Sequence, residues 1–562
     1  MYHFPKVLST IERYVILILA IIALGSLIAI PVSAYYHFTF EKPDYGGTYR
    51  EGVVGTPQHI NPLLLQDNDP DNDIAQLVYS GLMKQGPSGL IDEFDLAESY
   101  TVSNDGLLYT FTLKPNIFWH DGKQFTSDDV VFTIQAAQNE EYDSPQLINW
   151  HGVEVSKVDD RVVTFKLSNR YAQFMNNMTL GILPSHLWQD VRPRSFLLSD
   201  LNVKPIGTGP YKLNKIIRDD VGSFQSMEFI AYDRYHAGKP FISKVIISFY
   251  DSETTMLRAL NQGKIDAMSF ISSNNISKIN NDGVSIKSLR IPRYFAIFFN
   301  QTHGKVVSEK AVRTALNYAT DKQTIVDSIL GGKASVVDSP LLPGIISVAK
   351  PTSIYEFNPD KAKQILDNAG WKTAVDGMRA KTIENKDKTT EVIPLEVEII
   401  TSNWPELANV ADAIKNQWQT IGVRAIVTSL PAIEIQQKKL KDRDYSALFF
   451  GQILYLSPDP FSFWHSKQKT YPGRNLAVFD DKDADKLLED ARQVIDPRQR
   501  FDKYSQLQNI IISNAPAVFL YSPDYLYVQP KTLRTNSPTS ISIPSYRLQD
   551  INKSFIETRR AF

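Results

Sequence analysis

Apolar and polar residues along this chain of 562 residues alternate with two periods, which predict its strands and helices. The segment 108–113 alternates aromatic and leucine side chains with threonines, which predicts a half-buried strand. Thr126 and Asp129 then have the spacing of a helix capping box. Apolar residues recur at i, i+4 and i+7 from Val130, which predicts a helix with one buried face.

The same patterns predict elements along the rest of the chain. Strands are expected at 153–155, 162–167, 228–232, 245–250, 293–300, 423–428 and 517–528. Helices are expected at 74–82, 171–180, 254–262, 308–321, 358–370, 407–418, 484–495 and 497–513. Residues 373–392 are polar and predict a solvated hairpin or loop. Helices that alternate with strands indicate an α/β fold.

The N-terminal region carries an apolar run, Val15–Val32, of 18 residues. As a helix it would span about 27 Å, roughly one hydrocarbon thickness. Lys6 and Arg13 precede it, which favours a cytoplasmic N-terminus. Residues 32–34 resemble a cleavage site, so a signal peptide is the alternative, but the length of the run favours an uncleaved anchor. Residues 35–45 are expected to form a spacer that reaches about 36–40 Å when extended.

Composition narrows the class of protein further. Apolar residues make up 43% and charged residues 22% of the chain, the balance of a globular protein with a large core. The length predicts two to four domains. The net charge of −2, without a basic cluster, gives no reason to expect nucleic acid as a partner. The chain has no cysteine, which excludes disulfides, thiolate metal sites and cysteine nucleophiles.

No motif indicates an enzyme, a cofactor or a metal. Gly331–Ala334 lacks the hydroxyl of a phosphate-binding loop, and the glycines of 205–211 precede Pro210 rather than a helix. The acidic segment 67–73 has aspartates at calcium-loop positions 1, 3 and 5 but lacks the required glycine and glutamate. We therefore expect these acids to cap the helix at 74–82, and we expect no enzymatic activity, cofactor or metal.

One long stretch carries more information in its residue identities than in its strand and helix periodicity. It comprises Ser103, Asp105, Gly106, Tyr109–Phe111, Leu113, Trp119–Gly122, Phe125, Thr126 and Asp129–Phe132. This sequence motif resembles that of the solute-binding proteins that deliver peptides to ABC importers, the oligopeptide/dipeptide/nickel-binding family 5. Shorter matches at 46–50, 55–62, 205–211, 263–266 and 308–322 extend the resemblance from about residue 46 to about residue 530. The lipid-attachment cysteine that tethers many relatives is absent.

The resemblance implies a two-lobed periplasmic-binding-protein fold of type II, of α/β class, with a small domain inserted in the N-terminal lobe. The apolar run adds an N-terminal transmembrane helix. The implied divisions are 1–14 (cytoplasmic), 15–34 (anchor or signal), 35–45 (spacer), 46–62 and 189–291 (lobe I), 63–188 (inserted domain), 292–515 (lobe II) and 516–562 (return to lobe I and tail).

The implied function is capture of an oligopeptide-like ligand by a monomer on the outer face of the cytoplasmic membrane. The ligand would pass to the permease and ATPase of an ABC transporter. The alternatives are a sensor or chaperone that reuses the fold, or a binder of an oligosaccharide or metal chelate. An envelope hydrolase is a third class of protein, but no sequence motif supports it.

Four stretches are implied to face the ligand. Their residues are His59, Asn61, Tyr79, Thr208, Tyr294, Phe298, Gln452, Tyr455, Ser457, Asp459, Arg474 and Asn475. Peptide binders of the family carry an aspartate that pairs with the ligand's ammonium, three residues before a second acid. Here the second acid is Asp459 and the first falls on Leu456, or on Tyr455 or Ser457 if the loop shifts. A buried ammonium without a carboxylate is costly, so the ligand's identity stays open.

Overall fold

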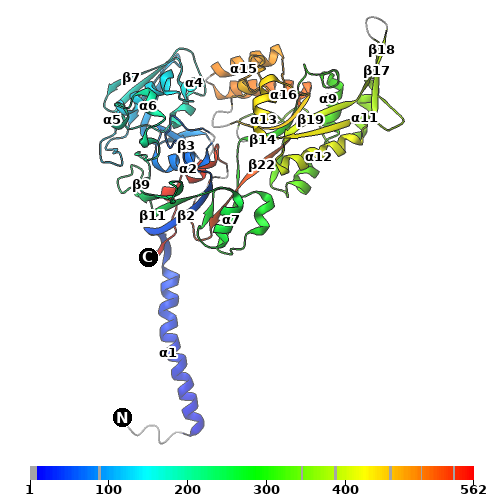
Figure 1. Ribbon diagram of the computed structural model, residues 1–562. Helices are drawn as coiled ribbons and strands as arrows, with labels where there is room; N and C mark the ends of the chain where they lie inside the picture. Colours follow the sequence, from blue (N-terminus) through cyan, green and yellow to red (C-terminus); the bar gives the residue numbers. More distant parts are fainter. Residues whose placement is uncertain are drawn as a thin grey trace.

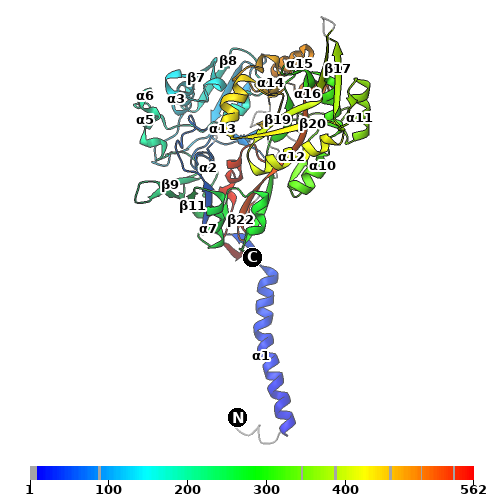
Figure 2. The ribbon, with the colours of Figure 1, turned by 45° about the vertical axis from the view of Figure 1, so that its right-hand side comes forward.

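A computed structural model describes the chain at residues 9–66, 68–86, 90–342, 346–384, 389–454, 459–494, 496–535, 538 and 540–561. The body consists of two halves on one mixed sheet, and a single long helix projects from the first half (Figures 1 and 2).

The central sheet has 12 strands and runs through both halves. Its path follows β20 (Arg424–Leu430), β19 (Glu396–Ser402), β21 (Ala447–Ile453), β14 (Arg293–Phe299), β22 (Ala517–Pro530), β12 (Ala267–Met268), β2 (Gly46–Val54), β11 (Ile242–Tyr250), β10 (Phe224–Ala231) and β9 (Tyr211–Arg218). Two further strands, β13 (Val284–Arg290) and β15 (Ala334–Val336), also pair with β22.

The chain joins the halves at two places. The first half of β22 pairs with β14, and its second half pairs with β13. The short link Ile291–Pro292 between β13 and β14 is the second connection. We call the half built on β2 and β9–β12 lobe I, and the half built on β14 and β19–β21 lobe II. The predicted two-lobed α/β fold is confirmed.

Lobe I carries a small domain around a four-stranded sheet, shown in cyan and blue-green in Figure 1. Its strands are β5 (Ala97–Val102), β6 (Leu108–Leu113), β7 (Val153–Asp159) and β8 (Val162–Leu167), next to the hairpin of β3 (Met83–Gln85) and β4 (Ile91–Phe94). The helices of lobe I and this domain are α2 (Asp69–Val78), α3 (Ser127–Gln138), α4 (Leu147–Trp150), α5 (Ser185–Trp188), α6 (Pro193–Phe196) and α7 (Glu253–Asn261).

Lobe II packs helices against both faces of its sheet. They are α8 (Lys305–Ser308), α9 (Lys310–Tyr318), α10 (Lys322–Thr324), α11 (Pro359–Asn368), α12 (Pro405–Gln419), α13 (Ala432–Glu434), α14 (Phe461–Trp464), α15 (Lys482–Gln493) and α16 (Pro497–Asn514). The predicted hairpin is formed by β17 (Arg379–Glu384) and β18 (Thr390–Pro394), beside β16 (Lys372–Thr373). One core contains Ile297 and Trp418, and the other contains Tyr294 and Trp464, so β14 contributes to both.

Asp129 explains why the motif around residues 103–132 specifies a fold. The predicted capping box forms, because Asp129 accepts a hydrogen bond from the backbone N–H of Thr126 at 2.9 Å. Its second oxygen, Oδ1, accepts hydrogen bonds from Ser185, from the backbone N–H at 2.9 Å and the hydroxyl at 2.7 Å. The indole N–H of Trp119 lies 3.3 Å from Oδ2. One buried carboxylate thus joins α3 to the start of α5 and to the loop that carries Trp119.

A buried ion triad holds the C-terminal segment to lobe I. Arg547 lies in a 3₁₀ turn at Pro544–Leu548, and its side chain is 1% exposed. Its guanidinium lies 2.9 Å from Glu51 on β2 and 2.8 Å from Asp73 on α2. Both carboxylates are fully buried. Because the guanidinium of Arg547 is the partner of two buried carboxylates of lobe I, the C-terminal segment that carries it is packed as part of this lobe.

The expected spacer at 35–45 does not have the extended form that we predicted. Helix α1 (Thr10–Phe38) continues through its first residues, and β1 (Phe40–Pro43) pairs antiparallel with β23 (Thr558–Ala561) at the other end of the chain. Arg560 donates hydrogen bonds to the carbonyls of Tyr36 at 3.1 Å and Thr39 at 3.0 Å. The C-terminal strand therefore fixes the end of α1 to lobe I.

Two helix predictions also need correction. The helix predicted at 74–82 begins at Asp69 and ends at Val78, because Pro70 sits in its first turn and supplies no N–H that needs a partner. Asp69 and Asp71 therefore lie inside the first turn rather than in a loop before the helix. The helix predicted at 171–180 is a 3₁₀ turn at Phe174–Thr179.

Candidate functional site

A cavity of about 3090 Å³ separates the lobes. Lobe I and the small domain supply one wall, from α2, the loop before it and the segment 145–181. Lobe II supplies the other wall, from the start of β14, the start of α12, and the segments 459–474 and 489–493. Residues 523–526 of β22 line it between the lobes. Ligand pockets of about 300–1,000 Å³ suffice for drug-sized molecules, so this cavity has room for a much larger ligand.

The lobe I wall is built on Asp71 of α2. Its carboxylate accepts hydrogen bonds from the backbone N–H groups of Gln58 at 2.8 Å and His59 at 3.1 Å. The side-chain amide of Asn68 donates to it at 2.7 Å. This fixes the loop that brings His59 to the cavity, and Tyr79 lines the same wall. Burial raises the pKa of Asp71, and the two backbone hydrogen bonds oppose the shift.

The glycine turn at 205–211 supports this wall from behind. A Cβ atom on Gly207 would lie 1.9 Å from the carbonyl oxygen of Val78, so only glycine fits there. His120 holds the turn on its other side, since Nε2 lies 2.9 Å from the carbonyl of Gly209 and Nδ1 accepts the N–H of Gly207 at 3.3 Å. Burial lowers the pKa of His120 to about 4. The turn therefore positions α2 rather than contacting ligand.

The rim of lobe II carries charges that are paired within the protein. Asp459 accepts a hydrogen bond from Arg492 Nε at 2.7 Å and another from the backbone N–H of Phe461 at 3.1 Å. The Arg492 guanidinium lies over the ring of Phe461, 3.9 Å from its centroid. The carbonyl of Arg492 accepts the N–H of Ala172, so this rim contacts the small domain across the cavity mouth at 3.0 Å.

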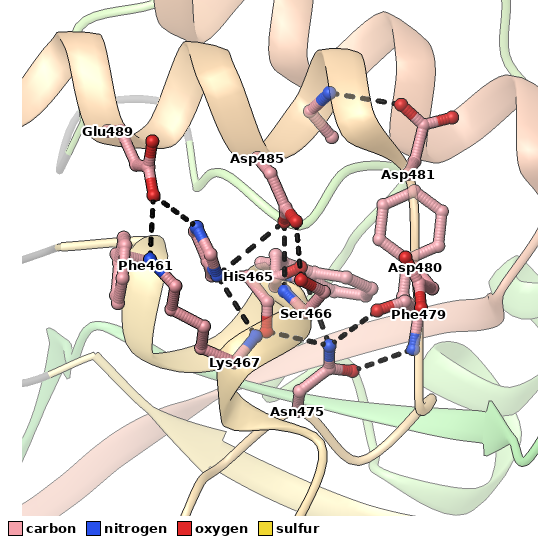
Figure 3. Close-up of polar contacts among 12 residues, drawn as sticks. Phe461, His465, Ser466, Lys467, Asn475, Phe479, Asp480, Asp481, Asp485 and Glu489 are labelled. Carbon is pink, nitrogen blue, oxygen red and sulfur yellow. Dashed lines mark hydrogen bonds and ion pairs between the residues drawn. The ribbon is translucent and has the colours of Figure 1, made fainter.

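A second paired network lies next to it (Figure 3). Nδ1 of His465 accepts the backbone N–H of Lys467 at 3.0 Å, so Nε2 carries the proton and faces Glu489 at 3.2 Å. Lys467 Nζ lies 3.1 Å from the same Glu489 oxygen. The backbone N–H of Ser466 donates to Asp485 at 2.9 Å. These contacts fix the loop after α14 to helix α15.

The floor of the cavity differs, because its charges have no partner in the described part of the chain. Arg293 opens β14, and its Nε is fully buried without a hydrogen-bond partner. Burial lowers the pKa of Arg293, while Glu406 in the first turn of α12 opposes the shift. Burial raises the pKa of Glu406, and Arg293 opposes that shift. The neighbouring Trp404 is 62% exposed and lines the cavity.

Four of the twelve predicted site residues line the cavity: His59, Tyr79, Asp459 and Arg474. Tyr455 and Ser457, like Leu456, fall outside the described residues. The cavity lining does not include the remaining six, Asn61, Thr208, Tyr294, Phe298, Gln452 and Asn475, which are buried in the protein.

The contacts of these buried residues are made within the protein. Asn475 donates to the carbonyl of Phe479 at 2.8 Å and accepts its N–H at 3.0 Å, which closes a loop (Figure 3). The hydroxyl of Tyr294 hydrogen-bonds to Gln452 inside the core. Sequence reasoning missed Arg293, Trp404 and Glu406. The period of β14 could have found Arg293, because residues next to each other on a strand face opposite sides.

No group of three or more potential metal-binding side chains is gathered at one place within the described ranges.

Comparisons with known proteins agree with this architecture. The family model of the bacterial extracellular solute-binding proteins, family 5, matches residues 93–474. The oligopeptide-binding protein AppA of Bacillus subtilis is 30% identical over 507 residues, which covers 88% of this chain and 89% of AppA.

Two solved structures are also similar. The structure of AppA from Bacillus subtilis in complex with a nonapeptide has a TM-score of 0.70 at 26% identity and covers 92% of this chain and 100% of that one. NikZ from Campylobacter jejuni, in complex with Ni(L-His), has a TM-score of 0.72 at 28% identity and covers 90% of this chain and 99% of that one.

Proposed function

Because this chain belongs to family 5 of the bacterial extracellular solute-binding proteins, we propose that it captures an oligopeptide between its lobes and delivers it to the permease of an ABC importer. The observation that carries this proposal is the cavity of about 3090 Å³ between two lobes, which the chain connects through β22 and the link at 291–292. A ligand held by both walls would stabilise the closed arrangement of the lobes.

The walls of the cavity suit an extended peptide. The lining includes aromatic surfaces such as Trp404 and Phe461 in lobe II, and polar groups such as Gln58 and Asn149 on the opposite wall. Apolar surface with a few placed polar groups is typical of ligand sites. The relative AppA, solved with a nonapeptide, supports a ligand of this length.

In this sequence the position of the ammonium-binding aspartate falls on Leu456 or a direct neighbour, none of which is acidic. The following acid, Asp459, is already paired with Arg492. We therefore expect peptide binding that depends little on a free N-terminus. An N-acetylated peptide should bind about as tightly as the same peptide with a free amine.

The test is a melting-temperature screen of the full chain with random peptides of two to nine residues, because a ligand that binds the folded state raises the melting temperature. Small-angle scattering with the best peptide should show a smaller radius of gyration. No stabilisation by any peptide pool would contradict the proposal. Nickel with L-histidine, the ligand named for NikZ, is the second probe, and stabilisation by it alone would favour a metal-chelate binder. We expect no peptide to be cleaved.

We further propose that α1 anchors the protein, as a monomer, on the outer face of the cytoplasmic membrane. Within the described residues Ile11–Phe38 is the one helix long and apolar enough to cross a membrane, and none of it is buried. Its apolar side chains project outward, for example Leu27 at 74% exposure. Its 28 residues span about 42 Å, more than the roughly 30 Å of a hydrocarbon core.

The anchor leaves little free chain between membrane and body, because β1 pairs with β23 directly after α1. Such a tether would raise the effective concentration of the protein near its permease. N-terminal sequencing of protein from its native membrane tests the anchor. A mature start at Tyr35 in the soluble fraction would show a cleaved signal peptide instead.

A further inference from the structure

An arginine, Arg293, lies on the floor of the cavity. Arg293 is the first residue of β14, directly after the link between the lobes. Residues 294, 296 and 298 of this strand face one core of lobe II, so Arg293 and Phe295 lie on the opposite face. Both line the cavity. The ring of Phe295 stacks on Tyr521 of β22, with centroids 5.3 Å apart.

The guanidinium of Arg293 has neither a hydrogen bond nor an ion pair with any described residue, and its Nε has no exposure to solvent. The hydroxyl of Tyr521, which interacts electrostatically with Arg293, is also buried without a partner among the described residues. A buried donor that gives up water without gaining a partner is unfavourable, and more so when it is charged. Buried polar groups without a partner are uncommon in folded proteins, and each calls for an explanation.

The other buried arginines among the described residues have partners within the protein. Arg547 has Glu51 and Asp73. Arg379 donates to Asp367 at 2.6 Å and to the carbonyl of Trp371 at 2.7 Å. Arg313 donates to carbonyl oxygens at the ends of neighbouring elements. Of these four arginines, Arg293 alone lines the cavity, and it alone has no partner within the described residues.

Glu406 does not complete an ion pair with Arg293, although it is near enough to act on it electrostatically. It lies in the first turn of α12, whose N-terminal end faces the cavity through Trp404 and Pro405. The floor thus presents a guanidinium with free donors beside an aromatic surface. A guanidinium binds a carboxylate through two parallel hydrogen bonds, which gives both affinity and direction.

We propose that Arg293 binds a carboxylate of the ligand, and that in a peptide this is the C-terminal carboxylate. The inference rests on the proposed function, to which it adds an orientation. The C-terminus of the peptide would lie at the floor beside β14, and the rest of the chain would run toward the rim formed by Phe461 and Arg492. Selection would act on the acid end of the ligand rather than on its amine.

The experiment compares matched ligands with matched variants. Isothermal titration measures the binding of one nonapeptide as free acid and as C-terminal amide, using a sequence from the stabilising pool. The proteins are the full chain, Arg293→Gln, and Lys415→Gln as a control. Lys415 is an exposed cation on α12, outside the cavity lining, so its loss removes the same charge without touching the floor. Circular dichroism checks that all three proteins are folded.

The full chain and Lys415→Gln should bind the acid about tenfold to a hundredfold more tightly than the amide, as expected for a hydrogen-bonded charge. Arg293→Gln should bind acid and amide alike. An undiminished preference for the acid in Arg293→Gln would overturn the inference, as would equal binding of both ligands by the full chain. In either case peptide capture itself would still stand.

A second ligand pair separates this inference from the proposed function. If no peptide binds, nickel with L-histidine and nickel with L-histidinamide are titrated in the same way. A preference for the acid that Arg293→Gln abolishes would support the carboxylate site and reject the peptide ligand. Absence of any acid preference in this pair as well would overturn the inference.

Discussion

The rim and the floor of lobe II carry similar charged side chains, but those of the rim are paired with other described residues of the protein and those of the floor are not. At the rim Asp459 has Arg492 at 2.7 Å, and Glu489 has both His465 and Lys467 (Figure 3). At the floor Arg293 and its neighbour Glu406 form no such contact among the described residues. Charges that the protein pairs itself hold the backbone in place. Charges that it leaves open at a cavity are available to a ligand.

This contrast has an energetic side. Removal of one member of a closed ion pair leaves the other buried without its partner, whereas removal of a charge that has no hydrogen bond or ion pair breaks no such contact. Stability measurements on substituted proteins should therefore rank the paired sites above the open one. The predictions below follow that ranking.

The largest effect should come from the buried triad, which is the extreme case of internal pairing. Arg547→Met would leave Glu51 and Asp73 buried without a cation and should cost about 3–5 kcal/mol of unfolding free energy. Urea denaturation of the soluble region measures it. Arg559→Met is the control, because its side chain is 68% exposed, and it should change stability by less than about 0.5 kcal/mol. Equal effects of the two substitutions would contradict the ranking.

Acid should weaken the protein through His120, whose ring is held neutral behind the lobe I wall. Burial lowers its pKa to about 4 from an ordinary value near 6.5, so the unfolded chain binds a proton in this range and the folded chain does not. Its contribution is complete above pH 6.5 and is lost as the pH falls toward 4, by about 2–3 kcal/mol.

Denaturation at several pH values checks this, with His120→Gln as the comparison. The substituted protein should lose less stability between pH 7 and pH 4 than the parent. A parallel decline of both proteins would assign the acid sensitivity to other groups.

A smaller loss is expected at the rim. Arg492→Met removes the partner of Asp459, whose side chain is 9% exposed, but the arginine itself is 36% exposed and part of its charge is already screened by solvent. We expect a loss of about 1 kcal/mol in thermal or urea unfolding. Lys486→Met on the same helix α15, at an exposed position, should be neutral. A neutral Arg492→Met would mean that the rim pair does not hold its loop.

The smallest effect on stability should be at the floor. Arg293→Met removes an unpartnered guanidinium and should leave the unfolding free energy of the ligand-free protein within about 0.5 kcal/mol, or raise it slightly. Differential scanning calorimetry without ligand measures it. A loss as large as that of Arg547→Met would show that Arg293 is paired within the protein after all.

The fold was predictable from the sequence because its signals are local. The capping box at Thr126 and Asp129, the alternation at 108–113 and the helix start at Asn358 each depend on a few neighbouring residues. The spacer at 35–45 was not predictable, since its strand pairs with residues more than 500 positions away.

The site was predictable only in part, for a related reason. A matched motif locates a strand but does not say which face of it meets the ligand. Tyr294 and Phe298 were predicted at the site and lie in the core, whereas Arg293 and Phe295 on the other face line the cavity. Glu406 and Trp404 come from a helix start more than a hundred residues later, and only the folded sheet brings them to Arg293.

The most direct test of the contrast between rim and floor is a crystal structure of the full chain with a nonapeptide free acid. The account predicts a carboxylate oxygen of the ligand within hydrogen-bond distance of the Arg293 guanidinium, about 2.7–3.0 Å, with the contact between Asp459 and Arg492 unchanged. A bound peptide whose ammonium displaces Arg492 from Asp459, while Arg293 stays without a partner, would contradict it.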